Sequence, residues 1–100
     1  MDNISKELHE FLIRLGKDPH CVKHTIEHYV KHLLCLLTRE DETIFRQYYG
    51  LFGEDVTKLE DIAHRRGINP DMMEKIIEAD LRKIAITPEW QMIRQLIDKQ

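Results

Sequence analysis

Apolar side chains recur at intervals of three and four residues along almost the whole chain, and no stretch has the alternating pattern of a β-strand. In the first segment Leu8, Leu12 and Leu15 fall on one side of a helix, which Gly16 is expected to end. The pattern predicts an all-α protein with about six helices. We expect these helices at about residues 4–15, 19–37, 38–49, 57–66, 70–84 and 88–97.

Residues that commonly cap helix N-termini stand at most of these boundaries. Asp18-Pro19 and Asn69-Pro70 each place a capping side chain directly before a proline, which is favoured in the first helical turn. Thr38 and Thr57 each open a segment as the first residue of a capping box. The apolar stripe that begins after Asp18-Pro19 continues to Leu37, so this predicted helix is the longest in the chain.

A chain of 100 residues is long enough for one domain, or for one domain with an arm. The only candidate boundary lies near Thr38. We expect residues 1–37 to form a two-helix N-terminal arm, and residues 38–100 to form a helix-turn-helix domain with an extra C-terminal helix. Because two apolar stripes are costly to leave in water, the arm should pack either on that domain or on a second copy of itself in a homodimer.

Several classes of protein are excluded by what the sequence lacks. No window approaches the roughly 18 apolar residues of a membrane span, and the N-terminus lacks the features of a secretory signal, so we expect a cytoplasmic protein without membrane contact. On one continuous helix Cys21 and Cys35 would lie far beyond disulfide distance, and they are expected to be free thiols. Without a glycine-rich phosphate loop or a nucleophile elbow, we expect no enzyme activity, no catalytic residue and no cofactor.

The segment around Gly67 has the spacing of a helix-turn-helix. Two short helices that cross steeply need a small residue where they touch, which Ala63 supplies, and a glycine suits the turn four residues later. Apolar residues should fill the space beneath, at Ile62, Ile68, Met73 and Ile76. An ordinary helical hairpin with a glycine turn is the alternative interpretation of the same spacing.

Further motifs flank this segment in a set order. They are Leu37-Thr38-Arg39-Glu40-Asp41-Glu42, Tyr49-Gly50-Leu51-Phe52-Gly53, Leu59-Glu60-Asp61-Ile62-Ala63 and Ala79-Asp80-Leu81-Arg82-Lys83-Ile84. In this order and spacing, over about half of the chain, they resemble region 4, the C-terminal helix-turn-helix domain of sigma-70-type RNA polymerase sigma factors. The resemblance implies a role in bacterial transcription initiation, with promoter-type duplex DNA at the −35 element and RNA polymerase as partners. Only this one domain of a sigma factor is represented, so we do not expect a complete initiating factor.

The second helix of the motif departs from that family. Arginines that the family places there are replaced by Pro70, Met72 and Glu74, whereas Asp71 and Lys75 keep polar side chains. Arginine is the usual bidentate partner of guanine, so the sequence readout of the family does not transfer intact. The net charge of −3 also argues against strong nonspecific binding, and we expect weak DNA binding by the chain alone.

Nine residues remain candidates for DNA contact at and around the motif. Those at the end of its first helix, His64, Arg65 and Arg66, have an alternative interpretation. They form a solvated helix end, where positively charged side chains interact favourably with the helix dipole. The candidates are His64, Arg65, Arg66, Asn69, Asp71, Met72, Lys75, Arg82 and Lys83.

Two functions from different classes follow. The first is a sigma-like transcription regulator that binds DNA, RNA polymerase or both. The second is a protein-interaction module that keeps the sigma fold and no longer reads DNA, which the acidic second helix favours. A titration against random duplex DNA at several salt concentrations distinguishes them.

Four histidines are spaced four residues apart in the predicted helix 19–37. They are His20, His24, His28 and His32, and neighbouring pairs have the spacing at which a helix can chelate a transition metal. On a helical wheel they lie opposite the apolar stripe, so the simpler interpretation is a solvated face. No carboxylate or cysteine is obviously placed to complete a closed site, and we assign no metal site from the sequence.

Overall fold

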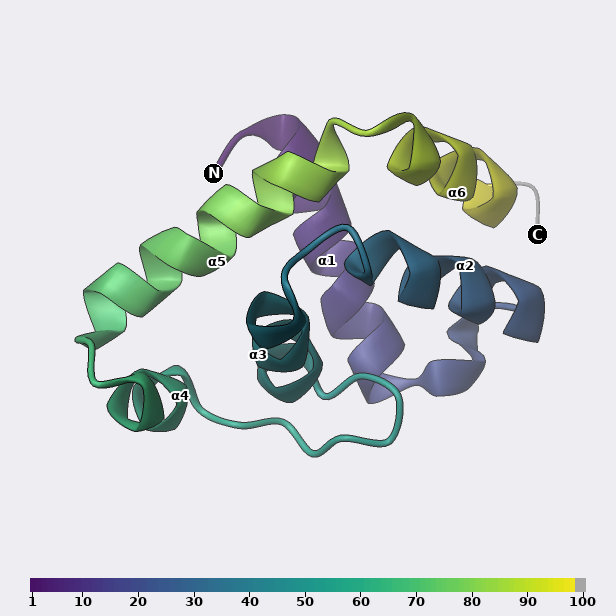
Figure 1. The fold of residues 1–100 in the computed structure, drawn as a ribbon. Coiled ribbons are helices and arrows are strands. Elements are labelled where there is room, and N and C mark those ends of the chain that lie inside the picture. Colours follow the sequence, from purple (N-terminus) through teal and green to yellow (C-terminus); the bar gives the residue numbers. More distant parts are fainter. Residues whose placement is uncertain (99–100) are drawn as a thin grey trace.

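The computed structural model describes residues 1–98, which form six α-helices and one short 3₁₀ helix and contain no strand. The predicted all-α class with about six helices is therefore confirmed. The elements are α1 (Asn3–Lys17), η1 (Pro19–Cys21), α2 (His24–Leu34), α3 (Arg39–Tyr49), α4 (Leu59–Arg66), α5 (Pro70–Ala85) and α6 (Pro88–Asp98), as Figure 1 shows.

Helix α1 begins at an aspartate cap and continues past the glycine that was expected to end it. The Asp2 carboxylate accepts a hydrogen bond from the Ser5 backbone N–H at 2.8 Å. Gly16 lies inside the helix, which extends to Lys17, so its expected role as a helix stop is wrong. A Cβ at residue 16 would overlap the carbonyl oxygen of Tyr49, and glycine is therefore needed where α1 and α3 approach each other.

The single long helix expected at residues 19–37 is also wrong. The Asp18 carboxylate caps as predicted, since it accepts a hydrogen bond from the His20 backbone N–H at 3.0 Å, but only a 3₁₀ turn follows it. Val22 has an extended backbone, with φ −131° and ψ 161°, which separates η1 from α2. Its side chain is only 8% exposed, so the break in the helix coincides with burial of a β-branched residue against the core.

The second helix ends earlier than its apolar stripe predicts. Helix α2 stops at Leu34, and the backbone N–H groups of Cys35, Leu36 and Leu37 then bond to carbonyls three residues back. Cys21 and Cys35 both lie outside α2, so one continuous helix does not separate them, and both are free thiols, as expected.

Helix α3 begins and ends as its sequence predicts. Thr38 Oγ1 accepts a hydrogen bond from the Asp41 backbone N–H at 3.2 Å, and Gly50 ends the helix in the left-handed conformation with φ 68°. Phe45 and Tyr49 are buried aromatic residues of this helix, Tyr49 at 3% exposure, whereas Tyr48 is half-buried. The Tyr49 hydroxyl lies 2.7 Å from Nδ1 of His9 on α1, which gives the buried hydroxyl a polar partner.

Helix α4 starts later than the capping box at Thr57 predicts. Lys58 occupies the N-cap position, and no side chain there caps the helix. The Thr57 backbone N–H instead donates to the Gln47 carbonyl oxygen at 2.7 Å, which ties the loop after α3 back to α3. Thr57 is therefore a loop residue, and the capping box does not form.

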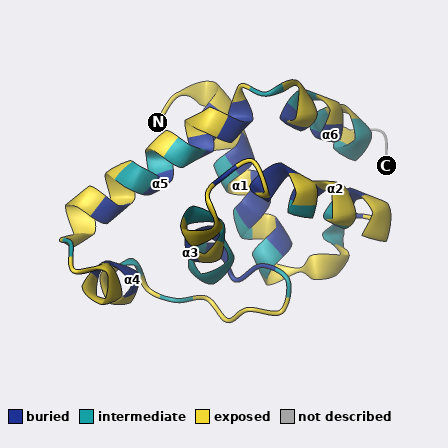
Figure 2. Ribbon diagram, in the orientation of Figure 1, coloured by how far each residue is buried: buried dark blue, intermediate teal, exposed yellow. Residues whose placement is uncertain are grey.

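The N-terminal helices pack on the C-terminal helices of the same chain. Helix α1 lies against α5, and α2 lies against α6, as Figure 1 shows, and Figure 2 shows buried residues on the facing sides. Phe11 and Trp90 meet there with ring centroids 5.6 Å apart. Residues 1–37 therefore pack on the rest of the same chain, which is one of the two arrangements expected for them. Residues before and after the boundary at Thr38 contribute to one buried cluster.

Residues 99 and 100 of the segment 38–100 lie outside the described part. Within the described part, no helix combines the length and the apolar character that a membrane crossing requires.

Candidate nucleic-acid interface

A three-residue turn joins α4 to α5. Gly67 ends α4 in the left-handed conformation, with φ 71° and ψ 26°, and the Ile68 backbone N–H donates to the Ala63 carbonyl at 3.1 Å. Asn69 Oδ1 then accepts a hydrogen bond from the Met72 backbone N–H at 2.8 Å and opens α5. The positions expected to be small or apolar beneath the turn are buried at Ile62, Ala63 and Met73 and half-buried at Ile68 and Ile76.

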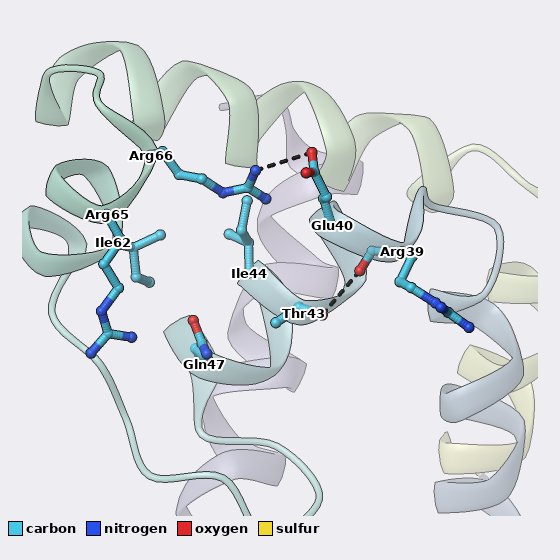
Figure 3. A pocket seen from close by; sticks show the side chains of 8 residues that line it. All are labelled: Arg39, Glu40, Thr43, Ile44, Gln47, Ile62, Arg65 and Arg66. Atoms are coloured by element: carbon cyan, nitrogen blue, oxygen red, sulfur yellow. Dashed lines mark hydrogen bonds and ion pairs between the residues drawn. The ribbon is translucent and has the colours of Figure 1, made fainter.

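A cleft of about 260 Å³ separates α3 from α4, with arginines around its opening. Figure 3 shows Arg66 reaching across the cleft above Ile44, where its Nη1 forms an ion pair with Glu40 Oε2 at 3.0 Å. Arg65 and Arg39 lie at opposite ends of the cleft, and both are exposed. The cleft is lined by Arg39, Glu40, Thr43, Ile44, Gln47, Ile62, Arg65 and Arg66.

The first two turns of α5 present an exposed face beside this cleft. Asp71, Met72 and Lys75 are all exposed, with 48% of Met72 accessible to solvent. The side-chain oxygen of Asn69 is engaged in capping α5, which makes it less available to a ligand. Predicted contact residues from α4 and from the start of α5 therefore lie at one end of the molecule, away from α2 and α6 (Figure 1).

The remaining predicted contacts lie elsewhere. Arg82 and Lys83 belong to the last turn of α5, about 15 Å along the helix axis from Met72 at a rise of about 1.5 Å per residue. Arg82 Nη1 forms an ion pair with Asp2 Oδ2 at 2.9 Å, which places the start of α1 beside this part of α5. The nine candidates thus form two groups instead of one continuous surface.

Carboxylates of α4 and α5 lie near Tyr48, on another flank of α5. Burial raises the pKa of Tyr48, and the negative charges of Glu74, Glu60 and Glu78 raise it further. These acids therefore lie close enough to the tyrosine to influence its ionisation. A phosphate backbone that approached α5 from this flank would be repelled.

A carboxyl pair, Asp41 of α3 and Asp80 of α5, lies between these two helices. Burial raises the pKa of Asp80 to about 7, and the neighbouring Asp41 contributes through a hydrogen bond and through repulsion of its charge, while Lys83 acts in the opposite direction. Near neutral pH a fraction of Asp80 is protonated and can donate a hydrogen bond to Asp41.

The contribution of α3 to this surface is not visible in the sequence. Arg39 stands in one of the motifs that resemble the sigma domain, but no local pattern places it near Arg65 or Arg66. Only the packing of α3 on α4 makes Arg39, Arg65 and Arg66 line one cleft. The polar side chains of Thr43 and Gln47 join the same surface for the same reason.

Comparisons with known proteins found no relative of this chain. The chain matches no protein-family model, no curated protein and no solved structure at a significant level. Among the described residues, no group of three or more histidine, cysteine, aspartate or glutamate side chains is arranged to hold a metal ion.

Proposed function

We propose that this chain is a helix-turn-helix regulator of bacterial transcription that contacts duplex DNA through α4 and the start of α5. The observation that carries the proposal is the gathering of Arg39, Arg65 and Arg66 around one cleft beside the α4–α5 turn. We call these three residues the arginine edge. Arginine side chains on one edge are the groups that bind the phosphates of a duplex.

The position of the arginine edge suits the way a helix-turn-helix docks. In this motif the first helix crosses the DNA backbone, and the N-terminal residues of the second helix enter the major groove. Arg65 and Arg66 are in the last turn of α4, and Met72 and Lys75 are exposed in the first turns of α5. Phosphate contacts from α4 and groove contacts from α5 can therefore be made from the same end of the molecule.

The contact with DNA is weak when the chain is alone. Asp71 and Glu74 are exposed on the first turns of α5, and the Arg66 charge is partly compensated by Glu40. A regulator of this kind acts when a partner holds it near DNA, because a tether raises its effective concentration toward the millimolar range. The resemblance to sigma region 4 supports RNA polymerase as that partner and the cytosol as the compartment, and the proposed role is binding without catalysis.

A salt-dependent titration tests the DNA contact. A labelled random-sequence duplex is titrated with the full chain at several salt concentrations, and fluorescence anisotropy gives the affinity. Each arginine that touches a phosphate contributes about 0.9 to the slope of log affinity against log salt concentration. Arg65→Ala and Arg39→Ala should each lower the affinity and flatten the slope by about that amount.

A matched control removes one positive charge from the opposite end of the molecule. Lys31→Ala on α2 should leave the affinity and the slope close to those of the unaltered chain, since Lys31 lies away from the α4–α5 turn. Equal effects of Lys31→Ala and Arg65→Ala would show that only overall charge matters, and the arginine edge would then not be an interface.

The carboxylates of α5 favour a second candidate function. Glu74 and Glu78 of α5 and Glu60 of α4 lie near Tyr48, and such a surface suits a basic protein partner better than a phosphate backbone. Under this alternative the chain is a protein-interaction module. It would bind purified RNA polymerase while showing no affinity for duplex DNA at low salt.

A further inference from the structure

The exposed face of α2 brings two imidazoles together. His28 and His32 are exposed, and their Nε2 atoms lie 3.2 Å apart. The two rings are nearly perpendicular, with an interplanar angle of 87° and centroids 4.6 Å apart. His20 is separated from them because it lies in η1, beyond the extended backbone at Val22.

We propose that His28 and His32 form a bidentate site for a divalent transition-metal ion of the copper, nickel and zinc class. Bonds of about 2.0–2.1 Å from one metal to both nitrogens, across the observed 3.2 Å, require an angle of about 100° at the metal. That angle lies between the values of square-planar and tetrahedral coordination. Imidazole nitrogen is a preferred ligand of all three metals.

The surroundings leave the two nitrogens available. The contact between the imidazoles is exposed, so water competes with it and little free energy is lost when a metal replaces the shared proton. On the same helix the charges of Glu27 and Lys31 offset each other in an ion pair of 3.8 Å. No net positive charge on this turn therefore opposes a cation at His28 and His32.

The site is open instead of closed. In the described part of the chain no third histidine, cysteine or carboxylate completes a metal-binding group, so water fills the other coordination positions. Binding is therefore exchangeable, and affinity should follow the general order in which Cu²⁺ binds more tightly than Ni²⁺ or Zn²⁺. The site is independent of the proposed DNA interface, which lies at the other end of the molecule (Figure 1).

A bound ion would join two successive turns of α2. It links residues four positions apart, and so it stabilises the helical form of this segment against fraying. Because the folded chain binds the ion in this arrangement and the unfolded chain does not, the melting temperature should rise with metal concentration.

Calorimetric titration of the untagged full chain with NiCl₂ tests the proposal. One ion should bind per chain, with no metal-dependent dimer in sedimentation. His28→Ala and His32→Ala each convert a chelate into a single ligand, and each should weaken binding by about 10²-fold or more. Circular dichroism should show unchanged helix content, since both side chains are exposed.

His24→Ala is the matched control. His24 is exposed on the same helix and stands four residues before His28, but it makes no ring contact with it in the described structure. Its substitution should leave nickel affinity unchanged. The proposal is overturned if His24→Ala weakens binding as much as His32→Ala, if no saturable binding occurs, or if the ion binds only between two chains. Titration with CuCl₂ should give tighter binding than NiCl₂, and the reverse order would also count against a two-imidazole site.

Discussion

The backbone of Gly16 on α1 packs directly on the carbonyl of Tyr49 at the end of α3, with no room for a side chain between them. The contact joins two helices that are far apart in sequence. It fixes how closely α1 approaches the end of α3, which a loop connects to α4.

Gly16→Ala should destabilise the chain. In the interior of a helix, replacing glycine by alanine normally stabilises by roughly 1 kcal/mol, but here the new Cβ would overlap a backbone atom that cannot rotate away. Forcing the two helices apart should cost about 1–3 kcal/mol in the free energy of unfolding. Urea unfolding gives the value, and Lys17→Ala on the same helix should change it by less than about 0.5 kcal/mol. A stabilised Gly16→Ala variant would contradict the close contact.

Gly67→Val should destabilise the chain through backbone strain alone. The φ of 71° at this position is unfavourable for a β-branched residue by roughly 1–3 kcal/mol, whereas the space around an added Cβ is open. Gly67→Asn is the control, because asparagine tolerates the left-handed conformation and should cost much less. Thermal melts compare the two, and equal melting temperatures would rule out strain at the α4–α5 turn as the cause.

Asp80→Asn should make stability less dependent on pH. The folded chain raises the pKa of Asp80 to about 7 from an ordinary value of 3.8, so the folded state holds a proton that the unfolded state releases between these values. The stability that Asp80 contributes is therefore fully present below about pH 4 and is lost as the pH rises through about 7.

At pH 8 the Asp80→Asn variant should thus be more stable than the unaltered chain, by an amount on the order of 1 kcal/mol because solvent screens this half-exposed pair. The advantage should disappear near pH 4, where Asp80 is protonated. Unfolding at several pH values measures it. Asp55→Asn, in an exposed loop, should show no such trend.

Met72→Arg combined with Asp71→Arg should raise the affinity for duplex DNA and steepen its salt dependence. These substitutions place arginine on the exposed first turns of α5, where each bidentate arginine–guanine pair is worth roughly 1–3 kcal/mol. The control pair Met92→Arg and Glu89→Arg makes the same change in charge on exposed positions of α6. Fluorescence anisotropy should show a much smaller increase for the control, and equal increases would argue against α5 as the helix that meets DNA.

Local capping and helix class could be predicted from the sequence. Asp18, Thr38 and Asn69 all act as caps, because a capping hydrogen bond joins a side chain to a backbone N–H only two or three residues away. Gly67 adopts the left-handed conformation for an equally local reason, the absence of a Cβ. Patterns of this range depend little on the rest of the chain.

The predictions that failed depend on residues distant in sequence. Thr57 does not cap α4, since Lys58 is the N-cap residue and the Thr57 backbone N–H donates to the Gln47 carbonyl oxygen in the preceding helix. The stripe from residue 22 to residue 37 looks like one helix, but the backbone at the buried Val22 is extended and separates η1 from α2. Periodicity cannot distinguish a continuous helix from two segments whose apolar residues face the same core.

The order of amino acids alone is sufficient to establish that this chain is all helical, where most of its helices begin, and which glycine makes the turn between α4 and α5. Helix packing was needed to establish that Arg39 lines the same cleft as Arg65 and Arg66 and that Arg82 lies beside Asp2. It also showed that Gly16 packs closely on the Tyr49 carbonyl and does not end α1. The difference lies in the range of the interactions. Caps and turns are satisfied within a few residues, whereas charges and close backbone contacts are placed by helices that pack from opposite ends of the chain.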